Sequence, residues 1–476
     1  MKEDLIQHPL KKDDILYFLH IPKTAGTSFT AILDNFFDLY SICPEQTWHQ
    51  FLRKMPNFNY NFIRGHYGYS ICKILPKEPV CITMLRDPID RTRSYYDHIH
   101  AYPKANHQLP DDYLSDDESL LDVLNNKDKK KIFSNVQTRH IAVDIDGLSL
   151  SKLLGSTEHE KYVGIFENFP AFVDIDTSDS TLITKAKKRL SKFAFVGLVE
   201  KYEESLLLLY YTFGWKPIRN KWKLMQTGKT KKEDLSELTM KAIKNCTKLD
   251  QELYGFARQL FEQRYTEMIN ILKEKYYEPR LSNLSFLDMM FELLEKNYES
   301  NLILQSNYQS SINYNFSKAL SGSGWHYREF SQLGTVYRWT GDDVESTIDF
   351  QLSNVHDVTI RFRIIDKIES DVVESLQVFS NGIPIDIKKI QQNGNTIIFE
   401  AFISKKILQS KKKVTNLTFK VNRTVQVVLN NPPIYTGTRM VGLAFDQILV
   451  HPTLDSQLEN IDLVVRRFIK ELKSSA

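Results

Sequence analysis

The sequence has little cysteine and almost no excess of charge. Four cysteines stand among 476 residues, with neither a CxxC pair nor metal-ligand spacing. A disulfide framework is therefore excluded, and we expect no metal site and four reduced thiols, at Cys43, Cys72, Cys81 and Cys246. The net charge is only +3, so charge does not indicate a nucleic acid or an acidic membrane as partner.

Long apolar runs are also missing. No window approaches 18 uninterrupted apolar residues, so we expect no membrane span. Residues 1–14, MKEDLIQHPLKKDD, lack the apolar core of a signal peptide. With 42% hydrophobic and 25% charged residues, the composition is that of a soluble globular chain. At roughly 150 residues per domain, the length predicts two to three domains.

Strand and helix patterns alternate in the first 300 residues. Residues 15–21 predict a buried strand, followed by a turn of small residues and a helix over 29–37. Residues 80–85 predict a second strand, followed by a turn at 86–88 and a helix over 90–101. Further predicted elements are a helix opened by a capping box at 115–118, a helix at 181–192, a strand at 193–199 and a helix at 202–213 ended by Gly214. This alternation predicts an α/β fold with a parallel sheet covered on both faces.

The pattern changes after residue 300. Residues 231–299 are helical in pattern, and 300–324 are rich in Ser, Asn and Gly, which is typical of a linker. Short alternating segments follow, at 347–352, 358–364, 375–379, 396–402, 416–421, 424–429 and 441–450. This spacing predicts an antiparallel β-sandwich domain over 315–455, after a first domain over 1–300. Residues 456–476 predict a short amphipathic helical tail.

The turn after the first strand predicts an anion site. Backbone amides of a strand–turn–helix connection point toward a ligand, and the helix dipole favours negative charge there. Lys23 adds a mobile cation, and Thr24, Thr27 and Ser28 add hydroxyl donors. The Walker A pattern is absent, which disfavours an ordinary ATPase or GTPase.

A second anion site is predicted after the strand at 80–85. Arg86 follows this strand, and Ser94 lies eight residues later in the next helix. A guanidinium and a hydroxyl near a helix start suit a second phosphate. Two phosphate sites on adjacent strand–helix units indicate a nucleotide with both a 5′ and a 3′ phosphate.

Five sequence blocks resemble those of the sulfotransferases, and one of them is the later block FAFVGLVEKYEESLLLLYYTFGW at 193–215. HIPKTAGTSF at 20–29 is similar to their 5′-phosphosulfate loop, and LRDPIDRTRSYYDH at 85–98 to their 3′-phosphate segment. RGHYGYS at 64–70 and NVQTRHIA at 135–142 resemble blocks of the uronyl 2-O-sulfotransferases. The resemblance covers roughly residues 15–270 and implies a P-loop-type three-layer sulfotransferase domain. It also implies 3′-phosphoadenosine 5′-phosphosulfate as donor, no metal, and a hydroxyl acceptor on a carbohydrate.

The resemblance assigns roles to individual residues. Lys23 binds the 5′-phosphosulfate and stabilises the leaving oxygen, in a cradle completed by Thr24, Ala25, Gly26, Thr27 and Ser28. Arg86 and Ser94 hold the 3′-phosphate, and His66 is the general base. Eukaryotic members carry an N-terminal membrane anchor and lack the strand-rich region. The sequence therefore predicts a bacterial, cytoplasmic enzyme, and its acceptor stays open.

Other interpretations stay open for several of these residues. Ser94 could be a surface hydroxyl, and Arg86 could form an ion pair with Asp87 or Asp90. Rival candidates for the base are His98, His100, His140, Asp97 and Glu167. Arg64, Tyr67, Arg139 and Lys201 are either acceptor contacts or structural residues. The basic segment 226–232 is either a loop that closes on the nucleotide or a solvated loop.

The function itself has two alternatives. One is a P-loop phosphotransferase, which needs a Walker-type loop and a magnesium-binding acid. The other is a glycan-binding or assembly protein with a degenerate nucleotide site. In the C-terminal domain, Trp325 and Trp339 could stack on sugar rings or pack in the sandwich core. That domain resembles a sandwich module appended to bacterial glycan-modifying transferases.

Overall fold

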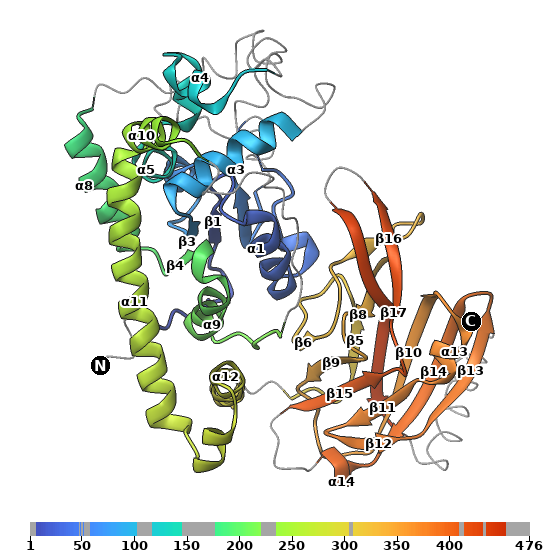
Figure 1. Cartoon of the computed structure of the whole chain (residues 1–476). Helices are drawn as coiled ribbons and strands as arrows, with labels where there is room; N and C mark the ends of the chain where they lie inside the picture. The colour runs from blue at the N-terminus through green and yellow to red at the C-terminus, as the bar shows by residue number, and fades with distance from the viewer. Residues whose placement is uncertain are drawn as a thin grey trace, which may run out of the picture. The chain divides into compact units, whose positions relative to one another are not determined.

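The computed structural model describes residues 6–46, 48, 51, 58–101, 117–144, 177–219, 235–303, 308–408, 414–431 and 435–453. The chain divides into two compact units, shown in Figure 1. The first consists of Met1–Pro217 and Trp222–Tyr298, and the second of Ile218–Lys221 and Glu299–Ala476.

A parallel sheet forms the centre of the first unit. Its described strands lie in the order β2-β1-β3-β4. Their bounds are β1 (Leu16–Leu19), β2 (Phe62–Gly65), β3 (Val80–Leu85) and β4 (Phe195–Leu198). β1, β2 and β4 are too short to be read from alternation alone, but β1 and β4 are buried at every position, as expected of strands covered on both faces. The predicted α/β class with a parallel sheet is confirmed.

Helices surround this sheet, and the long α11 runs along one side of the unit in Figure 1. The described α-helices of the unit are α1 (Gly26–Leu33), α3 (Pro88–Ala101), α4 (Leu120–Asn125), α5 (Val136–Ala142), α8 (Asp179–Leu190), α9 (Tyr202–Phe213), α10 (Glu237–Cys246), α11 (Lys248–Tyr276) and α12 (Phe286–Ile303). α1 packs on the sheet through Phe29, whose ring contacts those of Phe18 in β1 and Phe195 in β4. α9 ends where expected, because Gly214 takes the left-handed conformation at its C-cap.

The capping box was expected at the wrong place. Residues 115 and 116 lie outside the described residues, and the observed box that opens α4 joins Ser119 and Asp122. Each side chain bonds the backbone amide of the other at 3.2 Å. Glu118, the expected end of the box, instead binds Lys129 Nζ at 2.6 Å. An acidic run contains several candidate caps, and only tertiary contacts choose among them.

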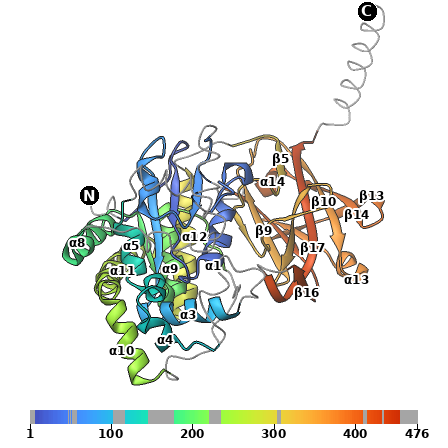
Figure 2. The same ribbon diagram turned by 90° about the horizontal axis from the view of Figure 1, so that it is seen from above.

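The second unit contains two antiparallel sheets, seen from above in Figure 2. One has the order β13-β14-β10-β17-β8-β7, with β16 and β5 also paired to β17, and the other has the order β12-β11-β15-β9-β6. The strands are β5 (Ile312–Asn315), β6 (Gly322–Ser323), β7 (Glu329–Phe330), β8 (Val336–Gly341), β9 (Glu345–Phe350), β10 (Val358–Lys367), β11 (Gln377–Ser380), β12 (Ile383–Ile385), β13 (Ile387–Asn393), β14 (Thr396–Ile403), β15 (Thr415–Lys420), β16 (Val425–Asn431) and β17 (Tyr435–Pro452).

The two sheets face each other across an aromatic core. Phe419 of β15 lies 5.2 Å from Phe362 of β10 and 4.9 Å from Phe445 of β17, between ring centroids. This packing is consistent with the expected β-sandwich. Trp325 and Trp339 are only 4% and 5% exposed, so their packing interpretation is confirmed.

The expected linker over 300–324 is wrong in part. α12 continues to Ile303, and residues 312–315 and 322–323 form β5 and β6. Polar residues occupy these strands because β5 pairs at the edge of β17, where alternate side chains face water. The predicted helical tail at 456–476 lies outside the described residues.

All four cysteines are free thiols. Among the helices that the structure describes, none combines the length and the apolar character needed to cross a bilayer.

Candidate active site

The predicted site residues follow the carboxyl ends of neighbouring strands. Leu19 of β1 pairs with Gly65 of β2, and His20 and His66 come directly after them. Arg86 directly follows β3, which pairs with β1 on its other side. Because parallel strands end at one edge of a sheet, the segments that begin at His20, His66 and Arg86 converge there.

The loop between β1 and α1 has an unusual backbone. Lys23 and Ala25 both take the left-handed conformation, with φ of 68° and 59°. Alternation of this kind turns successive amides toward one point, which suits an anion. Ala25 is the N-cap of α1 and provides no side-chain cap, and the first turn of α1 contains no acidic residue. The amides at this helix start are therefore not neutralised by a capping carboxylate.

Gly26 and Thr24 fix the shape of this loop. A Cβ atom on Gly26 would lie 1.6 Å from Nε2 of His20, so only glycine fits beside that imidazole. The Thr24 hydroxyl is buried and donates to the Ile21 carbonyl at 2.9 Å. Its single proton is therefore engaged within the loop and is not available to a ligand. Thr27 is exposed and Ser28 is half-buried.

Arg86 joins the second predicted segment to the first. Its Nη1 donates to the Lys23 carbonyl at 3.1 Å. Burial lowers the pKa of Arg86, against the opposite effect of Glu200 and Asp90, but an arginine stays charged at neutral pH. Its Nε is buried with no hydrogen-bond partner among the described residues. A buried cationic donor without an acceptor is costly, and a bound anion removes that cost.

Ser94 lies in the second turn of α3 and is 5% exposed. It is therefore not a surface hydroxyl. Arg86 contacts the Lys23 loop, while Asp90, one of its two alternative partners, pairs with Arg93 at 3.5 Å.

His66 is held in one orientation. Its Nδ1 lies 3.0 Å from the His20 carbonyl oxygen, and the two imidazole rings lie 4.3 Å apart between centroids. A carbonyl oxygen can only accept, so Nδ1 carries the hydrogen and the neutral ring has its lone pair on Nε2. This tautomer is the one that a base acting through Nε2 requires.

His20 was not singled out from the sequence, although it begins the HIPKTAGTSF block. Burial, followed by the nearby His66, His140 and Lys23, lowers the pKa of His20 well below its usual range. A neutral His20 adds no positive charge beneath His66. Its ring also stacks on Phe18 with centroids 5.3 Å apart, which fixes its position against Gly26.

Four of the five rival bases lie within the described residues. Asp97, His98 and His100 belong to the later turns of α3. His140 is fully buried in α5, with Nδ1 bonded to the Val136 carbonyl at 2.8 Å. Glu167 and the basic segment 226–232 lie outside the described residues.

Three residues considered as acceptor contacts have structural partners. Arg64 binds the Cys43 carbonyl at 2.9 Å and Asp34 at 3.2 Å. Tyr67 is buried and donates to the Glu45 carbonyl at 2.7 Å. Lys201 pairs with Glu262 at 2.6 Å.

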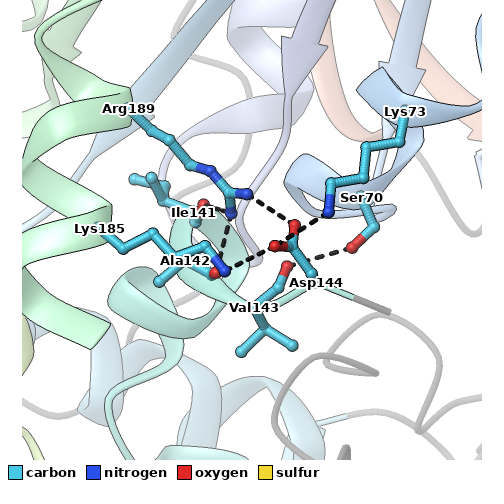
Figure 3. Close-up of polar contacts among 8 residues, drawn as sticks. All are labelled: Ser70, Lys73, Ile141, Ala142, Val143, Asp144, Lys185 and Arg189. Atoms are coloured by element: carbon cyan, nitrogen blue, oxygen red, sulfur yellow. Dashed lines mark hydrogen bonds and ion pairs between the residues drawn. The ribbon is translucent and has the colours of Figure 1, made fainter. Parts of the chain in front are cut away.

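An ion cluster around Asp144, drawn in Figure 3, supports the segment after His66. The Asp144 carboxylate binds Lys185 and Arg189 of α8 at 2.6 Å each and Lys73 at 3.0 Å. Ser70, four residues after His66, donates to the Val143 carbonyl at 3.1 Å. Burial raises the pKa of Asp144, but the bonds from Lys185, Arg189 and Lys73 outweigh it and lower the pKa to about 2. The sequence carried no signal for this cluster, because its members are far apart in the chain.

Among the described residues, there is no group of three or more His, Cys, Asp or Glu side chains that could hold a metal ion.

The comparisons with known proteins point to one kind of enzyme. Heparan-sulfate 6-O-sulfotransferase 1 of Homo sapiens is 26% identical over 294 residues, covering 55% of this chain and 69% of the relative. Heparan-sulfate 6-O-sulfotransferase 1-B of Danio rerio is 27% identical over 303 residues, covering 55% and 70%. Heparan-sulfate 6-O-sulfotransferase 2 of Homo sapiens is 23% identical over 303 residues, covering 55% and 47%. These relatives carry 6-O in their names, where the sequence blocks had suggested the 2-O branch.

No family profile matches the chain. One solved structure is similar at a TM-score of 0.20 and 11% identity, a family GH115 4-O-methyl-α-glucuronidase with specificity for decorated arabinogalactans. The likeness covers 62% of this chain and 44% of that chain, and at this score it supports no conclusion.

Proposed function

We propose, on the premise that the chain is a homologue of the carbohydrate sulfotransferases, that it transfers a sulfuryl group from 3′-phosphoadenosine 5′-phosphosulfate to a glycan hydroxyl. The homology supports sulfuryl transfer to a glycan by an enzyme. The donor, the residues that bind it and the base are parts of this proposal, and the geometry of the candidate site supports them.

The loop from Lys23 to Ser28 would hold the 5′-phosphosulfate. Its left-handed residues and the uncapped start of α1 turn backbone amides toward one point. Lys23 would stabilise the phosphate oxygen that leaves the sulfur. Ala25, Gly26, Thr27 and Ser28 would contribute amides or hydroxyls, and Thr24 would contribute its amide. This arrangement favours a P-loop-type, three-layer domain.

The environment of the Arg86 side chain is the observation that supports the proposal most strongly. Its buried Nε has no partner among the described residues, while Nη1 anchors it to the donor loop. A 3′-phosphate would supply the missing acceptor, with Ser94 as a further donor. This single contact separates a nucleotide with two phosphate positions from an ordinary adenosine 5′-phosphate.

His66 would act as the general base. Its Nε2 lone pair would take the proton of the acceptor hydroxyl while that oxygen attacks sulfur. The bond from sulfur to the 5′-phosphate oxygen breaks in line, giving a sulfate ester and 3′-phosphoadenosine 5′-phosphate. Catalysis rests on positioning and charge stabilisation, as in phosphoryl transfer. A cytoplasmic location and a bacterial source stay predictions from the sequence.

A label-transfer assay tests the reaction. The full chain is incubated with radiolabelled donor, a panel of glycans and a metal chelator. We expect label in at least one glycan, and loss of turnover by at least about 100-fold in Lys23→Ala, because the leaving charge is no longer stabilised.

Lys77→Ala is the matched control, since Lys77 pairs with Asp14 at the surface. Transfer that persists in Lys23→Ala, or that fails for the wild type with every glycan, would contradict the proposal.

A further inference from the structure

The backbone of Arg86 is clamped by a single buried side chain. The Arg86 amide donates to Oε1 of Gln137 at 3.0 Å, and Nε2 of Gln137 donates to the Arg86 carbonyl at 2.8 Å. Gln137 is 1% exposed. One amide side chain therefore satisfies both polar groups of the residue and fixes its backbone.

Gln137 is itself held by α11. The Asp250 carboxylate accepts three hydrogen bonds from α5. The donors are the Thr138 backbone amide at 2.7 Å, the Thr138 hydroxyl at 2.8 Å and the Gln137 backbone amide at 3.2 Å. In return, Oδ1 of Asn135 accepts from the Leu249 amide at 2.9 Å. The starts of α5 and α11 thus cap each other, which fixes where Gln137 stands.

The residue after Arg86 is held from the other side. The Asp87 amide donates to Oε1 of Glu200 at 2.9 Å, and the Tyr254 hydroxyl donates to Oε2 of Glu200 at 2.6 Å. Tyr254 and Asp250 both belong to α11 and lie four residues apart, on one face of the helix. α11 therefore reaches both residues of the turn, each through one intermediate side chain.

The buried Asp250 also has a cationic neighbour. Burial raises the pKa of Asp250, and the bonds from Thr138 and the charge of Arg91 act against that rise. Arg91 is fully buried in α3, five residues after Arg86. The α11 contact thus lies next to the helix that bears Ser94.

We propose that Gln137 and Glu200 are positioning residues for a 3′-phosphate site at Arg86, and that α11 holds both through Asp250 and Tyr254. The inference rests on the proposed function. Neither residue touches the ligand. Each removes backbone freedom from the turn, so that the Arg86 guanidinium is already aligned before the ligand binds. Less conformational entropy is therefore lost on binding.

The test compares two nucleotides on the full chain by calorimetric titration. One is 3′-phosphoadenosine 5′-phosphate, and the other is adenosine 5′-phosphosulfate, which lacks the 3′-phosphate. For Gln137→Ala we expect about tenfold weaker binding of the first, because two hydrogen bonds that fix Arg86 are lost. Binding of the second should stay within about twofold.

Gln137 is buried, so Gln137→Ala also affects the packing of α5. A second variant with a smaller structural change is therefore needed. Tyr254→Phe removes one hydroxyl, and we expect about threefold weaker binding of the 3′-phosphate nucleotide alone. Gln251→Ala is the matched control in α11, since its side chain binds, among the described residues, Thr247 and the Lys244 carbonyl alone. It should bind both nucleotides as the wild type does.

Equal weakening of both nucleotides, or no weakening in either variant, overturns the inference while the proposed function stands. A wild-type chain that binds neither nucleotide overturns the proposed function, and the inference with it. A thermal unfolding measurement on each variant checks that the variant is folded at the temperature of the titration.

Discussion

The two nitrogens of the His66 imidazole have different tasks. Nδ1 is bonded to the His20 carbonyl, and this bond leaves the lone pair of the neutral ring on Nε2. His20 is a spacer as well as a partner, because its ring also lies against Gly26 of the donor loop. One half-buried histidine therefore lies between the proposed base and the proposed phosphate cradle.

The first residue-scale prediction concerns His66→Ala. Turnover should fall about 10²- to 10⁴-fold, because no group replaces the base, while nucleotide binding stays nearly unchanged. Steady-state kinetics and a nucleotide titration separate the two effects. His356→Ala, an exposed histidine of the second unit, is the control. Normal turnover by His66→Ala would move the base to another residue.

The second residue-scale prediction concerns Gly26→Ala. The added Cβ would lie 1.6 Å from Nε2 of His20, so the loop or the imidazole must move. We expect a loss of about 1–3 kcal/mol in the free energy of unfolding, together with weaker nucleotide binding.

The matched control is Gly255→Ala in α11, where a Cβ meets nothing within 4 Å. That change should stabilise the protein by about 0.5–1 kcal/mol, because alanine favours the helix. Urea unfolding measures both. A Gly26→Ala variant as stable as the wild type would show that the loop does not depend on this contact.

Residues inside one motif could be predicted from the sequence, whereas their supports could not. Lys23 and Arg86 stand in recognisable blocks, and the structure connects them. Gln137 and Arg86 are 51 residues apart, and His66 and His20 are 46 apart. Such pairs exist only once the sheet places the strand ends together, and no local pattern specifies them.

Among elements, long helices and buried strands were predicted most closely. The strand at 80–85 and the helix at 202–213 have the observed bounds. β2 was missed because it has four residues and carries Arg64 in its middle, so it shows no apolar run. β1 provides its pairing partner, and that information lies outside the segment. β8, β12 and β13 of the second unit were also missed, because their pairing partners likewise lie outside their own segments.

The element-scale prediction for the first unit concerns Asp144, which ties α5 to α8 and to Lys73. Its folded pKa of about 2 lies below the ordinary value of 3.8. Its stabilising effect is therefore complete above about pH 4 and is lost as the pH falls toward 2. Because the side chain is partly solvated, we expect Asp144→Asn to cost only about 1 kcal/mol at pH 7.

Urea unfolding, measured between about pH 7 and pH 2, checks this expectation for Asp144. The difference between Asp144→Asn and the wild type should shrink as the pH falls from about 4 toward 2. Asp128→Asn is the control, since Asp128 is 82% exposed and pairs weakly with Lys131. A difference that grows on acidification would contradict the role assigned to the ion cluster.

The element-scale prediction for the second unit concerns His326, whose Nε2 donates to the Met440 carbonyl at 2.7 Å. Burial lowers its pKa from 6.5 to about 4, against the raising effect of that bond. The unfolded chain binds the proton first, so stability is complete above about pH 6.5 and falls as the pH drops toward 4. The full change is about 3 kcal/mol.

Unfolding of the second unit measured between pH 7.5 and 4 tests this expectation. His326→Gln should flatten the pH dependence, and His356→Gln, at an exposed histidine, should leave it as in the wild type. An unchanged pH dependence in His326→Gln would assign it to another group.

At the scale of the whole molecule, the chain divides into two compact units, and the described residues of the candidate site belong to the first. The change of sequence pattern after residue 300 indicated a division there, because helical periodicity gives way to short alternating segments. The pattern could not locate the end of α12, since polar residues continue the helix to Ile303.

The whole-molecule prediction concerns thermal unfolding of the full chain. We expect two calorimetric transitions, of which only one moves up when 3′-phosphoadenosine 5′-phosphate is added. At about 100 times the dissociation constant, the shift corresponds to about 2.7 kcal/mol. The temperature of the other transition, the one that depends on His326, should not change. A joint shift of both transitions would show that the units unfold as one.

The most direct test of the central claim is a calorimetric titration of the full chain with 3′-phosphoadenosine 5′-phosphate in the presence of a metal chelator. We predict tight, metal-independent binding that weakens at least about 100-fold in Arg86→Ala, because a charged contact to the 3′-phosphate is lost. Arg280→Ala, at an exposed arginine, should bind as the wild type does. No binding by the wild type at millimolar nucleotide would contradict the account.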